Sequence, residues 1–333
     1  MDRLDFAKYV SRLRAIETKL LDKTKIERMK DASSLDEVLR ILGETEYAAA
    51  ASSIKKPEDY EMVLSRELKN LYQLMYELTP ERKIIDLFSL RYDYHNIKVL
   101  LKGKYSGKSF DDMLINVGTI PAEKLSDYIK NNDYRDLDPL LREAIENTQH
   151  DYQETKDSQR IDLILDKYLY KDMLIRSEQL SNEFLLKFTK INIDLINIKT
   201  FLRVKKQKKG RDFLKEALLN GGSVDNDVFL NSLNDSVDNL VSRLSYTDYY
   251  KIMKTGLEDY DRNENIIGFE RLADDFLMNI IKDTKLISFG AEPIAAYIVA
   301  KETEIKLLRI ILVGKLNNIP SEVLGERLRD SYV

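Results

Sequence analysis

Apolar side chains recur every three or four residues over several long stretches of this chain. That spacing places them on one face of an α-helix, whereas a half-buried strand alternates with a period of two. No segment shows convincing strand alternation. The pattern predicts an all-α protein with short helices between long ones, which we place at roughly 3–30, 57–78, 80–104, 158–178, 182–207, 264–285 and 293–315.

Capping residues support these helix starts. Each of the six prolines precedes an amphipathic or apolar stretch, and Asp138-Pro139 and Thr79-Pro80 place a capping oxygen before a proline at the first helical position. Ser34 and Glu37 have the spacing of a capping box. Three glycines fall near the ends of long helices and are predicted to be C-caps: Gly103, Gly210 and Gly314.

A stretch of twelve residues occurs three times without a gap. The copies are 93–104, 194–205 and 304–315, and each contains an acid at its start, an apolar-basic pair, two adjacent apolar residues and a final lysine. Asn96 and Asn197 match each other, while Leu307 takes that position in the third copy. Three colinear copies at a near-equal period indicate a repeat architecture.

Each copy follows another long helix, which predicts three antiparallel helix pairs. We expect three similar units at 1–117, 118–219 and 220–333, arranged about a pseudo-threefold axis. Segments of short helices follow the first two copies, but little chain follows the third. The segment 1–52 would complete the third unit if the chain closes in a circle.

Composition excludes several kinds of function. The chain has no cysteine and two histidines, which removes disulfides, thiolate metal sites and His-rich metal clusters. Its net charge of -4 comes from 53 basic and 57 acidic residues that are interspersed, so no uniform field attracts nucleic acid or anionic lipid. No run of about 18 apolar residues exists, and the N-terminus is charged throughout, which predicts a soluble, cytoplasmic protein without a signal peptide.

Two of the repeated segments resemble a known family. Residues 88–106 (FSLRYDYHNIKVLLKGKYS) and 300–320 (AKETEIKLLRIILVGKLNNIP) look like the characteristic segments of the C subunit in the central stalk of V-type and A-type ATPases, whose eukaryotic V-ATPase equivalent is the d subunit. The resemblance covers essentially the whole chain. At one position, Lys306-Leu307, the family often has a basic residue followed by Asn.

The resemblance implies a funnel of three helical domains that acts mechanically and not as an enzyme. Such a protein is a rigid adaptor between the rotating central shaft and the membrane rotor ring of proteolipid subunits. It couples ATP hydrolysis or synthesis to proton or sodium transport. It is peripheral on the cytoplasmic face of the membrane and has no nucleic-acid partner, small-molecule substrate, cofactor or direct insertion into the bilayer. The alternative is a helical-repeat scaffold unrelated to a motor.

The repeated charges are the candidate contact residues. The acid and the basic residue of each copy are five positions apart, so they lie on different sides of the helix and cannot pair locally. A cyclic arrangement would let Lys199 meet Asp93, Arg309 meet Asp194, and Lys98 meet Glu304. The alternative is that each charge is solvated or faces the shaft.

No complete catalytic, cofactor-binding or metal-binding motif is present. The segment 103–109 ends like a Walker A motif but has three residues between its glycines, where the phosphate loop needs four. The acidic pairs at 111–112 and 274–275 lack the third acid of a DDxxD metal site, and the basic run 205–211 lacks interleaved aromatics. His95 is expected to be a hydrogen-bonded residue at a helix contact.

Overall fold

The computed structural model of the chain describes residues 3–263 and 266–333. Within these ranges the regular elements are helices and no strand is present, which confirms the predicted all-α class. The chain divides into two compact units, one formed by residues 83–240 and the other by residues 1–82 together with 241–333. None of the helices in the described ranges combines the length and the apolar character needed to cross a bilayer.

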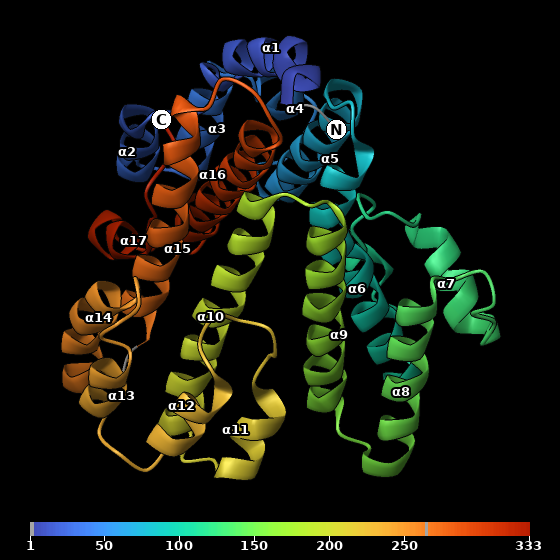
Figure 1. Ribbon diagram of the computed structural model, residues 1–333. Coiled ribbons are helices and arrows are strands. Elements are labelled where there is room, and N and C mark those ends of the chain that lie inside the picture. Colours follow the sequence, from blue (N-terminus) through green and yellow to red (C-terminus); the bar gives the residue numbers. More distant parts are fainter. Residues whose placement is uncertain (1–2, 264–265) are drawn as a thin grey trace. The chain divides into compact units, whose positions relative to one another are not determined.

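The unit 83–240 contains the first two copies of the repeated segment. Its helices are α6 (Arg82–Ser106), α7 (Ala122–Asn131), α8 (Pro139–Thr155), α9 (Ser158–Gln179), α10 (Glu183–Lys206), α11 (Arg211–Ala217), α12 (Asn226–Ser232) and the start of α13 (Val237–Arg243), with a 3-10 turn, η3, at Asp111–Met113. Long helices α9 and α10 lie antiparallel and side by side, as Figure 1 shows. Asn182 caps α10 by accepting a hydrogen bond from the Leu185 amide over 3.0 Å.

The other unit is built around the third copy. Its elements are η1 (Arg3–Phe6), α1 (Ala7–Glu17), α2 (Lys23–Asp31), α3 (Leu35–Leu42), α4 (Ala48–Ala51), η2 (Pro57–Asp59), α5 (Tyr60–Leu78), α14 (Tyr250–Asn263), α15 (Ile267–Lys282), η4 (Asp283–Leu286), α16 (Glu292–Leu316) and α17 (Ser321–Arg327). Helix α16 packs against α1, α2, α3, α5, α15 and α17. Because these neighbours surround it, most of α16 is buried and its sequence is apolar on nearly all sides.

Five of the seven predicted long helices are confirmed to within three residues: α5, α6, α9, α10 and α16. The helix predicted at 264–285 begins outside the described residues, and its described part is α15 with η4. The predicted caps Ser34 and Asp138 are confirmed, since their side chains accept hydrogen bonds from the amides of Glu37 and Leu140. Local signals were sufficient here because caps act within one turn of the chain.

The prediction of one helix over 3–30 was wrong. The chain leaves the helix after α1 and starts α2 at Lys23, where Asp22 caps the new helix by accepting from the Lys25 amide over 2.8 Å. Between the two helices Leu20 and Leu21 are buried. The break has a tertiary cause, because the Leu21 amide donates to a carboxylate of α16 instead of to its own helix.

The predicted glycine C-caps were also wrong. Gly103 and Gly314 lie inside α6 and α16, and Gly210 precedes α11. A Cβ on Gly103 would lie 2.9 Å from the Lys108 carbonyl, and one on Gly314 would lie 2.2 Å from the Leu324 side chain. These two glycines therefore allow close packing along the helix, which a pattern of helix ends cannot reveal.

Candidate functional site: anchors and joints of the repeated helices

The first residue of each repeated segment is a buried acid. Asp93 lies in the middle of α6 with no exposed surface. Its carboxylate accepts hydrogen bonds from the Thr119 amide (2.9 Å), the Thr119 hydroxyl (2.6 Å) and the Ile120 amide (3.0 Å). Burial raises the pKa of Asp93 to about 6, against the opposing effect of these hydrogen bonds. Asp93 thus fixes the loop that leads into α7.

The second copy repeats this anchor. Asp194 is fully buried in α10, and its carboxylate accepts from the amides of Ser223 (3.0 Å) and Val224 (3.1 Å) in the loop before α12. In both copies a glycine lets the loop approach. A Cβ on Gly118 or Gly222 would lie 2.1 Å from an oxygen of the respective aspartate.

The matching asparagines bind the same loops, because each side-chain amide both donates a hydrogen bond to one loop residue's backbone and accepts one from it. Asn96 donates to the Ile115 carbonyl and accepts from the Ile115 amide, each over 2.8 Å. Asn197 does the same with Leu219, over 2.9 and 2.8 Å. The side-chain amide thus satisfies a backbone N–H and a backbone C=O of a loop residue, which have no partner in a regular helix. Leu307, at this position in the third copy, has no side-chain group for such a contact.

The final lysine of the first two copies caps a short helix. Lys104 donates to the carbonyl of Ile129 at the end of α7 over 2.8 Å. Lys205 donates to the carbonyls of Leu233 and Asp235 after α12, over 2.8 and 2.5 Å. A positive group at these carbonyls complements the negative end of the helix dipole. The acid, the amide and the lysine therefore form a set of contacts that recurs in both copies. These contacts bind the loop and the short helix that follow each copy.

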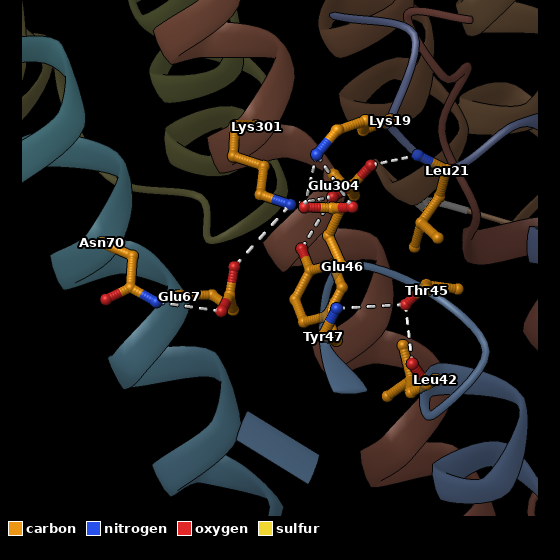
Figure 2. Close-up of polar contacts among 10 residues, drawn as sticks. All are labelled: Lys19, Leu21, Leu42, Thr45, Glu46, Tyr47, Glu67, Asn70, Lys301 and Glu304. Atoms are coloured by element: carbon orange, nitrogen blue, oxygen red, sulfur yellow. Dashed lines mark hydrogen bonds and ion pairs between the residues drawn. The ribbon is translucent and has the colours of Figure 1, made fainter. Parts of the chain in front are cut away.

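In the third copy the buried acid is Glu304, which is 5% exposed. Figure 2 shows that its carboxylate accepts hydrogen bonds from the Leu21 amide, the Tyr47 hydroxyl and the Lys301 ammonium. The last two are 2.7 and 2.6 Å long. Its partners thus come from the N-terminal part of the chain and from its own helix, where Asp93 and Asp194 use loops that follow them.

Lys301 also faces a second buried carboxylate. Its ammonium lies 4.0 Å from an oxygen of Glu67 on α5, as drawn in Figure 2. Burial raises the pKa of Glu67, while the nearby Lys301 charge opposes that rise. The two distances make Glu304 the near ion-pair partner of Lys301, with Glu67 at the limit of ion-pair distance.

The basic residues of the repeat make ion pairs between neighbouring long helices. Lys98 on α6 pairs with Asp166 on α9 over 2.6 Å, and Arg309 on α16 pairs with Glu61 on α5 over 2.6 Å. One turn further along α6, Lys102 pairs with Asp162 over 2.6 Å. Pairing with the repeated acids was one of two alternatives for these basic residues, the other being a solvated or shaft-facing charge. The ion pairs found for Lys98 and Arg309 are with acids on neighbouring long helices, and the repeated acids are buried as loop anchors. Lys199 is half-buried on α10.

The sequence also contains a second, shorter repeat that was not predicted. Residues 34–47 match residues 236–249 without a gap, and Ser34, Asp36, Leu42, Thr45 and Tyr47 are identical to the residues 202 positions later. Both copies form a short helix, α3 or α13, followed by a turn in which the threonine hydroxyl donates to a leucine carbonyl over 2.7 Å. Tyr47 and its counterpart Tyr249 are both buried.

The structure also places His95 and the near-Walker segment 103–109. His95 contacts the Met113 carbonyl through Nε2 over 3.0 Å, which confirms the expected hydrogen-bonded histidine. The near-Walker segment begins within α6, which continues to Ser106. In the described parts of the chain, no group of three or more His, Asp or Glu side chains could hold a metal ion.

Comparison with known proteins gives a consistent result. The family model of the ATP synthase (C/AC39) subunit matches residues 9–327. The C subunit of the V-type sodium ATPase of Enterococcus hirae is 30% identical over 320 residues, which cover 96% of this chain and 97% of that protein. The C subunit of the A-type ATP synthase of Methanocaldococcus jannaschii is 28% identical, with coverage of 98% and 87%. Its counterpart in Thermococcus kodakarensis is also 28% identical, with coverage of 95% and 88%.

Proposed function

Because the chain belongs to the ATP synthase (C/AC39) subunit family, a non-catalytic stalk component of rotary ATPases, we propose that it joins the rotating central shaft to the membrane rotor ring. In this role it couples ATP hydrolysis or synthesis to proton or sodium transport. The family match over residues 9–327 carries the proposal. The partners are then the shaft subunits and the proteolipid ring, on the cytoplasmic face of the membrane.

The anchored loops support a mechanical role. An adaptor that transmits torque must not yield between its two binding surfaces. Long helices satisfy their backbone hydrogen bonds internally, and the buried anchors at Asp93, Asp194 and Glu304 tie the intervening segments to them. Fully bonded buried polar groups hold one arrangement of a packed interior.

The six repeated charges divide into two groups under this proposal. The acids Asp93, Asp194 and Glu304 are buried and act as anchors inside the protein. The basic residues Lys98, Lys199 and Arg309 are at least partly exposed and stay candidates for contacts between repeats or with the shaft. Electrostatic contacts of this kind set the orientation of a partner more than its affinity.

Reconstitution tests the proposal. Adding the purified chain to membranes depleted of it should restore ion pumping that is coupled to ATP hydrolysis, while the chain alone should hydrolyse no ATP. The variant Lys108→Ala, in the near-Walker segment, should restore coupling as well as the unaltered chain does. Restored hydrolysis without restored pumping would contradict the role.

A pulldown from native membranes separates this role from that of a scaffold unrelated to a motor. The proposed function predicts that shaft subunits and ring subunits are recovered together with the tagged chain. Recovery of other proteins without either would favour the scaffold.

We also propose that residues 1–52 complete the third of three similar units. The contacts of Glu304 with Leu21 and Tyr47, and the match of residues 34–47 to 236–249, support this circular closure. A circular permutant that begins at Lys55, with the old ends joined by a flexible linker of about ten residues, should fold with an unfolding temperature within about 5 °C of that of the parent. Permutants opened inside α3 should not fold.

A further inference from the structure

The unit 83–240 contains a cavity of 620 Å³ that the proposed function does not use. It lies between the second half of α6, η3, the end of α8 and the start of α9. Its volume is in the range typical of small-molecule sites, roughly 300–1,000 Å³. The apolar part of the wall consists of Val99, Phe110, Met113 and Ile161.

Two tyrosines contribute aromatic surface to the wall of this cavity. The rings of Tyr105 and Tyr152 stack with their centroids 3.9 Å apart and their planes 18° from parallel. The Lys156 ammonium lies 5.7 Å from the centre of the Tyr152 ring. The position of Tyr105 is taken by Lys206 in the second copy of the repeat and by Leu316 in the third. This aromatic wall therefore belongs to the first copy alone.

The charges around the cavity do not cancel. Three ammonium groups line it, from Lys98, Lys102 and Lys156. Asp166 and Asp162 pair with the first two over 2.6 Å. Lys156 is exposed and has no carboxylate within ion-pair distance among the described residues. One positive charge is left over, at the edge of an apolar and aromatic cavity.

From this combination we infer that the cavity binds an amphipathic small molecule with a flat apolar body and a single anionic group. The body would lie against the tyrosine pair and the apolar wall, where burial of apolar surface supplies the affinity. The carboxylate, phosphate or sulfonate would meet Lys156, the one lining cation without a carboxylate partner in the part of the chain that the structure describes.

The matched probes are 1-anilinonaphthalene-8-sulfonate and its uncharged counterpart N-phenyl-1-naphthylamine. Fluorescence titration of the full chain should show one saturable site for the sulfonate. Lys156→Gln should weaken sulfonate binding about tenfold and change binding of the neutral probe less than about twofold. Val99→Trp, which places a bulky indole in the cavity, should weaken binding of both strongly. The control Lys124→Gln removes an exposed lysine away from the cavity and should change neither.

Two outcomes with the isolated chain would overturn the inference. One is binding that Val99→Trp leaves unchanged in a variant with unchanged helical content, since the probe would then lie elsewhere. The other is an equal effect of Lys156→Gln on both probes, since the anion would then play no part. A third arm uses the assembled complex. Retention of the sulfonate site there supports a small-molecule site, and its loss would mean that a partner protein fills the cavity instead.

Discussion

Tyr47 and Glu304 are 257 residues apart in sequence and meet in the interior through a hydrogen bond of 2.7 Å from the tyrosine hydroxyl to the carboxylate. The tyrosine hydroxyl is held un-ionised, because burial and the adjacent Glu304 charge raise its pKa well above its usual range. This contact ties the segment before α4 to the most buried helix of its unit.

Loss of the Glu304 charge should destabilise this unit strongly. Glu304→Gln leaves the buried Lys301 ammonium without its near partner, and removal of one member of a buried ion pair costs about 3–5 kcal/mol. Tyr47→Phe removes one hydrogen bond and should cost about 1 kcal/mol. Urea unfolding followed by circular dichroism measures both. Equal costs for the two variants would contradict the central role of the carboxylate.

Stability should depend on pH through Asp93. Its pKa is about 6 in the folded chain and near 3.8 in the unfolded chain, so the folded state binds the proton more tightly. The stability that this proton contributes is present below about pH 4 and is lost as the pH rises through about 6, with an upper limit of about 3 kcal/mol. Asp93→Asn should remove this dependence, because its amide does not titrate.

The test compares the two chains from pH 4 to pH 7. The unfolding free energy of the parent should fall relative to that of Asp93→Asn over this range. Glu67 and Asp275, whose pKa values burial also raises, titrate in both chains and cancel in the difference. A difference that grows in favour of the parent at higher pH would show that hydrogen bonds to the carboxylate outweigh its burial, and a constant difference would show that the two effects balance.

Alanine at either loop glycine should disturb the anchor beside it. A Cβ at Gly118 or Gly222 would come within 2.1 Å of the buried aspartate oxygen, so loop or helix must move, and such overpacking costs about 1–3 kcal/mol. Gly210→Ala is the matched control, since no atom lies within 4 Å of its added Cβ. Thermal unfolding of the three variants should rank the control above both loop variants.

The joint between α6 and α9 should show measurable coupling. A double-mutant cycle of Lys98→Met and Asp166→Asn should give a coupling energy of about 1 kcal/mol, because the Lys98 side chain is only 19% exposed. The surface pair Arg28 and Glu44, each 53% exposed, should give less than about 0.5 kcal/mol in the same assay. Additive effects at the α6–α9 pair would assign Lys98 to another role.

Local patterns along the chain were enough to predict the long helices, most of their ends and the recurrence of one helical segment in three copies. Apolar spacing and caps such as Asp138 act within a turn or two, so their signal can be interpreted without knowing the fold. The recurrence of Asp93, Asp194 and Glu304 is also visible in the sequence. Their role as buried anchors could not be predicted from it, because a repeated charged residue is compatible with a surface contact as well as with a buried one.

The partners of these acids depend on the tertiary fold. Asp93 binds a loop 26 residues further along the chain, whereas Glu304 binds residues near the N-terminus. The break between α1 and α2 has the same origin, since the Leu21 amide donates its hydrogen bond to the Glu304 carboxylate and not to a carbonyl of its own helix. A buried carboxylate needs several donors, and its burial makes that need strong enough to override local helix propensity. Which donors a buried carboxylate binds depends on the segments that the fold brings together, and local sequence patterns do not specify those segments.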